Sequence, residues 1–236
     1  MEASINESQK SAVSAASTRR LTLIQGPPGT GKTHCSVKVV QSLVARQSTL
    51  GSNGPILVCA GSNVAVDNLL AALIEVGIQA VRIGPSGTVR EELRVYSVEC
   101  MAKRQLASSS ESADFSQLRR LETQLVKGCH VVCATNVGAA SGILKKLTFN
   151  TVLMDEAAQA TEPVTLIPIV SRVSRVILVG DHKQLPPTVI CRTAAVQGLE
   201  KSLFDRLVAL EGPATHVEHP VPYAPCHRYV PFCSFL

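Results

Sequence analysis

The chain contains no tryptophan, and aromatic side chains make up only 3% of its 236 residues. Its core must therefore be aliphatic, which is typical of a parallel α/β sheet whose strands are runs of Val, Ile and Leu. No apolar run approaches the ~20 residues of a membrane-spanning helix, and the N-terminus lacks the apolar core of a signal peptide. We therefore expect no membrane partner and a reducing compartment, either cytoplasmic or nuclear.

Paired metal-binding cysteines are also scarce. Zinc sites typically contain cysteines in C-x-x-C pairs. Cys35, Cys59, Cys100, Cys129 and Cys133 form no such pair. Cys59, Cys129 and Cys133 stand in apolar runs, where a buried thiol acting as a small hydrophobic side chain is the favoured interpretation.

Short apolar runs alternate with segments of helical periodicity along the chain. The predicted strands are 21–25, 56–60, 80–84, 130–134, 151–155 and 175–181. The predicted helices are 32–46, 63–76, 89–106, 115–126 and 162–170. This alternation predicts an α/β fold, a parallel sheet with right-handed crossovers and helices on both faces. The charged, Ser-rich segment 88–128 is predicted to be a short helical stalk insertion.

The segment Gly26–Thr33 reads GPPGTGKT and matches the phosphate-loop pattern G-x-x-x-x-G-K-[ST], between a predicted strand and a predicted helix. Glycines let several backbone N–H groups turn toward phosphates, and the helix N-terminus adds its positive dipole end. Lys32 is expected to reach the β- and γ-phosphates, and the Thr33 hydroxyl to bind Mg²⁺. The predicted ATP-binding residues of the loop are Gly26, Pro27, Pro28, Gly29, Thr30, Gly31, Lys32 and Thr33.

Asp155 and Glu156 end the predicted strand 151–155. We expect a parallel neighbour to bring this strand end beside the phosphate loop, at the carboxyl edge where α/β proteins bind ligands. Asp155 can then hold Mg²⁺ through water, and Glu156 can orient and deprotonate the attacking water. An Asp-Glu pair at a strand end is more often a solvated helix cap, but the phosphate loop favours the catalytic interpretation.

Several further stretches together resemble one family. DEAAQATEP at 155–163 and VGDHKQLPP at 179–187 closely resemble superfamily 1 helicases, in particular the up-frameshift (nonsense-mediated-decay) and senataxin-like group. INESQKSAV at 5–13 looks like its adenine-reading Q motif, and the other matching stretches follow in order. They are SNVAVDNLL at 62–70, VRIGPSGTVREEL at 81–93, CATNVGAAS at 133–141 and KSLFDRL at 201–207. The resemblance covers roughly residues 5 to 210 and implies a RecA-like P-loop NTPase lobe.

The resemblance also implies residue roles. Gln9 would contact the adenine base, and Gln184 would sense the γ-phosphate and couple it to movement, in one loop with Asp181 and His182. Single-stranded RNA or DNA would be contacted by Ser62, Asn63 and Thr135.

The chain departs from the family pattern in three places. Gly61 stands where the family usually has Pro, and Asn136 where it often has Cys. The family's β-barrel insertion is missing or reduced to the stalk, which leaves open how this protein would bind a nucleic-acid strand.

The net charge of +5 is compatible with nucleic-acid binding but too small to establish it. Eight basic residues lie in or next to the stalk: Arg82, Arg90, Arg94, Lys103, Arg104, Arg119, Arg120 and Lys127. They could bind phosphates. The favoured interpretation is a solvated helix surface, because Glu91, Glu92, Glu99 and Glu122 are interleaved with them and no aromatic residues support base stacking there.

The segment 212–236 no longer fits this pattern, because it mixes Pro, His, Cys and aromatic residues. Cys226, His227 and Cys233 are close enough in sequence for a zinc site. The favoured interpretation is an out-of-frame tail, so we expect no zinc.

The argument for an out-of-frame tail rests on the codons. Codons permitted for Pro220 through Phe235, read one base later, can give Q-Y-R-M-H-P followed by A-I-G-T-F-P-S-A. The resembled family carries Q-Y-R-M-H-P followed by I-x-x-F-P just past this point. We therefore expect residues 1–211 to form the first helicase lobe. The frame would change near 212–216, through a mis-predicted splice junction or a real frameshift.

These patterns predict the ATP-binding lobe of an ATP-dependent RNA or DNA helicase, with ATP and Mg²⁺ as cofactors. In the family a second lobe supplies arginines, and an arginine finger is worth about 10³–10⁵ in rate. We expect the 236-residue chain alone to bind ATP weakly and hydrolyse it slowly. One alternative is a short nucleotide-binding or interaction module that does not unwind nucleic acid. Another, a P-loop ATPase of the AAA type, is disfavoured by the Q motif and GDHKQLPP.

Overall fold

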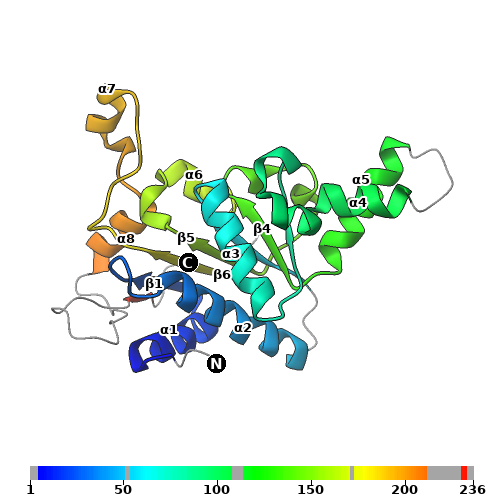
Figure 1. Ribbon diagram of the computed structural model, residues 1–236. Helices are drawn as coiled ribbons and strands as arrows, with labels where there is room; N and C mark the ends of the chain where they lie inside the picture. Colours follow the sequence, from blue (N-terminus) through cyan, green and yellow to red (C-terminus); the bar gives the residue numbers. More distant parts are fainter. Residues whose placement is uncertain (1–4, 51–53, 108–113, 171–172, 212–229, 233–236) are drawn as a thin grey trace.

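The computed structural model describes residues 5–50, 54–107, 114–170, 173–211 and 230–232. These residues form one sheet of seven strands in the order β3-β4-β2-β5-β6-β1-β7 (Figure 1). The strands from β3 to β1 in that order are parallel, as predicted, and β7 is antiparallel to β1. Their bounds are β1 Leu21–Gln25, β2 Ile56–Ala60, β3 Ala80–Arg82, β4 Val131–Thr135, β5 Thr151–Asp155, β6 Arg175–Gly180 and β7 Val230–Phe232.

Helices cover both faces of the sheet, and the alternation of strand side chains shows why. In β2, Ile56 and Val58 pack in a core with α1, α2 and α3, whereas Leu57 and Cys59 point to the opposite core with α5 and α8. The strands are therefore buried on both sides, which confirms the aliphatic parallel sheet. The helices are α1 Glu7–Thr18, α2 Lys32–Leu50, α3 Asn63–Glu75, α4 Val98–Ala107, α5 Phe115–Lys127, α6 Glu162–Leu166, α7 Arg192–Ala194 and α8 Leu203–Glu211.

Short 3₁₀ turns connect these elements: η1 Ser86–Thr88, η2 Glu91–Tyr96, η3 Gly138–Ala140, η4 Leu144–Lys146 and η5 Ala157–Gln159. A π-helical turn, η6 Ala195–Leu199, follows α7. Of the predicted buried thiols, Cys59 and Cys133 are fully buried, and burial raises the pKa of Cys133 to about 12. Cys129 is only partly buried.

The stalk departs from its prediction in the first half. A single helix over 89–106 was expected, but η2 and α4 are separated by the extended residue Ser97, which bridges to Arg82 of β3. The Arg90 N–H donates a hydrogen bond to the Asp67 side chain (2.9 Å), so it cannot donate to a carbonyl within a helix. The second stalk helix, α5, follows its prediction closely and lies beside α4, and the pair extends away from the sheet (Figure 1).

Three other elements differ from expectation. Strand β3 ends at Arg82 and α6 ends at Leu166, so both are shorter than predicted. Helix α1 was not predicted as a helix, although Asn6 and Gln9 form a capping box at its start that could have revealed it.

The tail prediction falls mostly outside the described residues. The expected frame change near 212–216 and the residues Cys226, His227 and Cys233 are not among those the structure describes. Residues 230–232 are described, and they pair with β1 at the edge of the sheet. The out-of-frame origin of 212–236 stays a prediction. In the part of the chain that is described, no helix is both long and apolar enough to cross a membrane.

Candidate ATP site and nucleic-acid edge

The phosphate loop connects β1 to α2 at the carboxyl edge of the sheet. The Gly26 N–H donates to the carbonyl of Gly180 on β6 (3.2 Å), which holds the start of the loop against the neighbouring strand. The loop is then closed on itself, because the N–H and the hydroxyl of Thr30 both donate to the Pro27 carbonyl (3.4 and 2.8 Å). Helix α2 begins at Lys32, so its free N–H groups open into the loop.

Two glycines in the loop adopt backbone conformations that other residues avoid. Gly29 and Gly31 have φ angles of 76° and 78°, in the left-handed region that glycine enters without steric cost. A Cβ on Gly31 would lie 3.2 Å from Nε2 of Gln9, and a Cβ on Gly26 would lie 2.6 Å from the Thr30 hydroxyl. The backbone is therefore tightly wound at these glycines, which fits a cradle for phosphate oxygens.

Lys32 lies over this loop rather than in solvent. The side chain is buried, and its Nζ donates to the Pro27 carbonyl at a long 3.5 Å. Its positive charge also acts on Asp155, where it partly opposes the rise in pKa that burial causes. The ammonium group is therefore folded back onto the phosphate loop, where a phosphate-binding lysine is required.

Thr33 and Asp155 meet directly, since the Thr33 hydroxyl donates to Oδ2 of Asp155 (3.3 Å). The expectation that β5 neighbours the phosphate-loop strand was wrong, because β6 lies between β5 and β1. The first turn of α2 spans this gap and carries the Thr33 hydroxyl to the end of β5. A hydroxyl and a carboxylate oxygen are hard ligands of the kind that Mg²⁺ binds, so the residues present fit the ion.

The carboxyl group of Asp155 is 4% exposed, and its pKa is raised to about 6. The main cause is burial, and the negative charge of Glu156 adds to it. The N–H of Glu156, the charge of Lys32 and the Thr33 hydroxyl act in the opposite direction. A bound divalent cation would offset the burial cost, because it favours the ionised carboxylate.

Glu156 stands at the exit of β5 with φ 51° and ψ 38°, the only positive φ of a non-glycine residue among those described. Its N–H donates to Oδ1 of Asp155 (3.0 Å), and its carboxylate accepts from the amide of Gln159 (3.3 Å). The left-handed conformation turns the chain sharply so that consecutive carboxylates are both retained at the site. Strained backbone of this kind persists where the surrounding structure holds it and is frequent at functional sites.

Gly180 makes this sharp turn possible from the neighbouring strand. A Cβ at this position would lie 3.0 Å from the backbone nitrogen of Ala158 and 3.3 Å from its Cβ. Any larger residue at the end of β6 would therefore displace the turn that follows Glu156.

Gln184 is linked to the phosphate loop through Asp181. The Gln184 amide donates to Oδ2 of Asp181 (3.1 Å), while Gln25 donates to Oδ1 (3.4 Å). Gln25 is the last residue of β1 and directly precedes Gly26. A chain of two hydrogen bonds therefore connects the expected sensor glutamine to the phosphate loop.

Gln9 joins helix α1 to the same loop. Its backbone and side chain form the capping box with Asn6 (2.8 and 3.1 Å), and its Nε2 donates to the carbonyl of Thr30 (3.3 Å). The expected contact with adenine stays a prediction, but the structure brings Gln9 to the ATP-binding loop.

Ser62, Asn63 and Thr135 lie along the same edge of the sheet. Thr135 is in register with Ala60 of β2, and Ala60 is in register with Asp155 of β5. Ser62 caps α3 by accepting from the N–H of Ala65 (3.2 Å), and the Thr135 hydroxyl accepts from the N–H of Gly138 (3.0 Å). The expected nucleic-acid residues thus lie at the carboxyl ends of β2 and β4, the first and second strands beyond β5.

The stalk charges form several ion pairs with neighbouring acidic residues. Lys103 pairs with Glu99 and Arg119 pairs with Glu122, both within one helix. The exposed Lys103–Glu99 pair supports the solvated-surface interpretation, whereas Glu122 is a buried partner of the half-exposed Arg119. Arg82 is different, because it is fully buried, and its grouping with the exposed stalk charges was wrong. The described residues contain no group of three or more His, Cys, Asp or Glu side chains that could hold a metal ion.

Comparison with solved structures supports the fold. The chain resembles a nuclease-deletion mutant of the Type ISP restriction-modification enzyme LlaGI in complex with a DNA substrate mimic. The TM-score is 0.50 at 14% identity, over 79% of this chain and 18% of that chain.

Comparison with curated proteins identifies nearer relatives. The chain is 40% identical over 227 residues to the ATP-dependent helicase upf1 of Schizosaccharomyces pombe, covering 87% of this chain and 24% of that protein. It is 42% identical over 230 residues to the ATP-dependent helicase NAM7 of Saccharomyces cerevisiae, covering 88% of this chain and 23% of that protein. The chain thus spans about a quarter of the length of these relatives.

A family profile described as "AAA domain" matches residues 4–120 and 112–192. The matched span includes α1, the phosphate loop and the end of β5, and it ends at the start of α7. The chain belongs to the family that this profile describes, and within it to the first RecA-like lobe of the superfamily 1, up-frameshift-like helicases.

Proposed function

We propose that the chain is the ATP-binding lobe of an ATP-dependent helicase that couples ATP hydrolysis to movement along single-stranded RNA or DNA. The observation that carries this proposal is the contact of Thr33 with Asp155 at the mouth of the glycine-lined loop, with Glu156 beside it. The family match and the relatives named as ATP-dependent helicases support it. They also favour a helicase over other P-loop ATPases.

ATP binding would use the loop, Lys32 and the oxygens of Thr33 and Asp155. The loop N–H groups and the start of α2 bind the phosphates, and Lys32 adds a positive charge near the γ-phosphate. Thr33 and Asp155 would hold Mg²⁺, which neutralises charge on the phosphates when bound. Glu156 accepts the proton of the attacking water, a contribution of about 10²–10⁴ in rate for a positioned general base.

Coupling to movement would pass through Gln184. Because Asp181 binds both Gln184 and Gln25, a change at the phosphate loop alters the hydrogen bonding of the segment after β6. That segment, residues 181–202 between β6 and α8, projects away from the sheet and carries α7 (Figure 1). We call it the projection.

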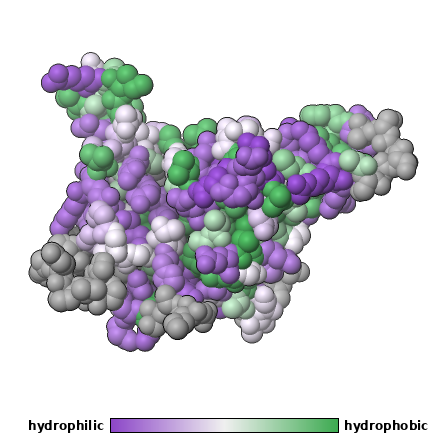
Figure 2. All heavy atoms as spheres, viewed as in Figure 1, coloured by the Kyte–Doolittle hydropathy of each residue, from purple (hydrophilic) through white to green (hydrophobic). Residues whose placement is uncertain are grey.

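The projection is a candidate contact for a second helicase lobe, which we also propose as a partner. Leu185, Ile190 and Val196 are at least 79% exposed, and hydrophobic side chains gather at the tip of the projection (Figure 2). Exposed apolar groups of this size are typical of protein contacts. On this proposal residues 1–211 form one lobe, with 88–128 as its stalk insertion.

Purified protein tests the proposal by fluorescent ATP binding and by ATP turnover, with and without single-stranded RNA or DNA. Lys32→Ala should abolish ATP binding. Glu156→Gln should retain binding and lower turnover by about 100-fold or more, because the base is lost and the cradle remains. Glu91→Gln, which neutralises an exposed carboxylate outside the site, is the matched control and should behave as the wild type.

Equal turnover by the wild type and Glu156→Gln would overturn the assigned base. ATP binding without turnover under any condition would instead favour a nucleotide-binding module without unwinding activity.

A further inference from the structure

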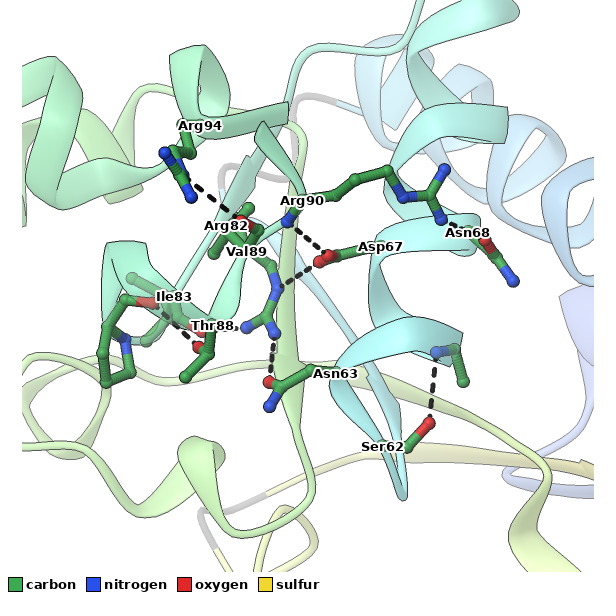
Figure 3. A network of polar contacts seen from close by, with 12 residues as sticks. Ser62, Asn63, Asp67, Asn68, Arg82, Ile83, Thr88, Val89, Arg90 and Arg94 are labelled. Carbon is green, nitrogen blue, oxygen red and sulfur yellow. Dashed lines mark hydrogen bonds and ion pairs between the residues drawn. The ribbon is translucent and has the colours of Figure 1, made fainter. Parts of the chain in front are cut away.

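Arg82, the last residue of β3, is buried in a position where a charged side chain needs compensation. Its side chain is 0% exposed and its partner Asp67, on α3, is 4% exposed. Nε of Arg82 and Oδ1 of Asp67 are 3.1 Å apart (Figure 3). A buried pair of this kind is retained at a cost in desolvation, so stability alone does not explain it well.

Each of the three guanidinium nitrogens of Arg82 donates a hydrogen bond. One of its terminal nitrogens donates to the carbonyl of Ile83, and the other donates to Oδ1 of Asn63 (2.7 Å). Gly84 has φ 145°, and a Cβ there would lie 3.0 Å from a nitrogen of Arg82. The backbone therefore closes around the group and leaves it one orientation.

This contact decides how the side chain of Asn63 is turned. A guanidinium group has only donors, so the amide oxygen of Asn63 must face Arg82 and its NH₂ must face away. Asn63 is exposed and is the first residue of α3. Ser62 beside it is also exposed and already accepts from the N–H of Ala65, which leaves its hydroxyl hydrogen free to donate.

The surface at the start of α3 therefore presents donors. They are the NH₂ of Asn63, the hydroxyl of Ser62 and the first two N–H groups of α3, those of Asn63 and Val64. Donors at a helix N-terminus bind phosphate groups well.

Asp67 extends the network into the base of the stalk. Its second oxygen accepts from the N–H of Arg90 (2.9 Å), and the Arg90 side chain bonds Asn68 on the same helix (Figure 3). Ser97, just before α4, bridges to Arg82. The start of α3 and the base of the stalk thus share one buried hydrogen-bond network.

We propose that Arg82 is a positioning residue for nucleic-acid binding. It holds Asn63 with its NH₂ toward solvent, where it donates to a backbone phosphate, and through Asp67 it ties this orientation to the base of the stalk. The inference rests on the proposed nucleic-acid function and deepens it.

Arg82→Lys is the decisive variant, because it keeps a positive charge beside Asp67 but lacks the planar fork that reaches Asn63. We expect the affinity for a fluorescein-labelled single-stranded oligonucleotide, measured by anisotropy, to fall about threefold to tenfold, the worth of one hydrogen bond. The affinity for a fluorescent ATP analogue should not change. Arg94→Gln is the charge control: Arg94 is exposed in the same region, and its loss should have a smaller effect.

A double-mutant cycle separates positioning from structural support. If Arg82 acts through Asn63, Asn63→Ala should weaken binding as much as Arg82→Lys, and the double variant should be no weaker. Additive losses, or a loss of ATP affinity equal to that of oligonucleotide affinity, would overturn the proposal. The side-chain amide NMR signal of Asn63 should also shift in Arg82→Lys, and an unchanged signal contradicts the contact.

Asn63→Asp decides the matter if Arg82→Lys does not fold. It keeps an oxygen for Arg82 but replaces the exposed donor with a carboxylate oxygen, so oligonucleotide binding should fall at least tenfold with no loss of melting temperature. Unchanged binding refutes the inference. If the wild type binds no single-stranded RNA or DNA, the nucleic-acid function itself fails, and the Asn63 amide signal still reports separately whether Arg82 orients it.

Discussion

Replacing Asp155 with asparagine should stabilise the metal-free protein while removing its response to Mg²⁺. Burial is the main reason that the pKa of this carboxyl group rises from 3.8 to about 6. At neutral pH that difference corresponds to about 3 kcal/mol by which the folded state disfavours the ionised group. Asparagine carries no charge, can accept from the Glu156 N–H through its oxygen, and can donate to the Thr33 hydroxyl through its NH₂. The predicted gain is therefore up to about 3 kcal/mol.

The pH dependence of the gain follows from the direction of the shift. Between about pH 4 and 6 the folded state binds a proton at Asp155 that the unfolded chain releases, so wild-type stability falls as pH rises through this window. The asparagine variant lacks this slope. The difference between the two proteins should be near zero at pH 4 and complete above about pH 6.

Thermal unfolding in EDTA between pH 4 and 8 measures this difference. A domain of this size should gain up to about 6–12 °C in melting temperature at pH 8. Glu91→Gln, which removes an exposed carboxylate, is the control and should show no such trend. Adding Mg²⁺ and ATP should stabilise the wild type more than the variant. Destabilisation of the metal-free variant at pH 8, or a gain that does not grow from pH 4 to 6, would refute the reasoning.

Two further predictions concern glycines at the site. Gly31→Ala should weaken ATP binding by about tenfold or more and lower the melting temperature, since φ is 78° and the new Cβ would press on Gln9. Gly142→Ala, where a Cβ meets nothing within 4 Å, is the matched control, and equal behaviour of the two variants in ATP-analogue titration would contradict this. Gly180→Ala should cost about 1–3 kcal/mol in denaturant unfolding, because its Cβ would meet the backbone of Ala158 at 3.0 Å. It should also lower ATP turnover more than ATP binding by displacing Glu156, and normal turnover would show that this close approach does not matter.

The sequence pattern was sufficient to predict those features that residues adjacent in the chain determine. The strands were recognised because residues such as those of 56–60 are apolar on both faces, as burial in a parallel sheet requires. The loop Gly26–Thr33 was recognised because its glycines and Lys32 act within eight consecutive residues. The capping box of Asn6 and Gln9 was equally local and was overlooked.

Contacts between distant residues could not be read in the same way. The order of strands in a sheet depends on how the whole chain packs, and no local feature of β5 indicates that β6 separates it from β1. Residues 89–97 carry helical periodicity, but Asp67 and Arg82 bind this segment and hold it in 3₁₀ and extended forms. Tertiary hydrogen bonds outweighed a propensity difference that is only a few tenths of a kcal/mol per residue.

By itself, the sequence determined that this chain is an aliphatic parallel α/β protein with an ATP-type phosphate loop, because both properties are encoded in consecutive residues. Only the tertiary structure decided that Thr33 meets Asp155 across an intervening strand. It alone also showed that Arg82 is a buried residue bound to Asp67 and Asn63 rather than a stalk charge in solvent. The physical reason is the same in both cases. The partners of a side chain depend on which strands and helices pack together. The identity of a basic or acidic residue does not reveal whether that residue is solvated or buried.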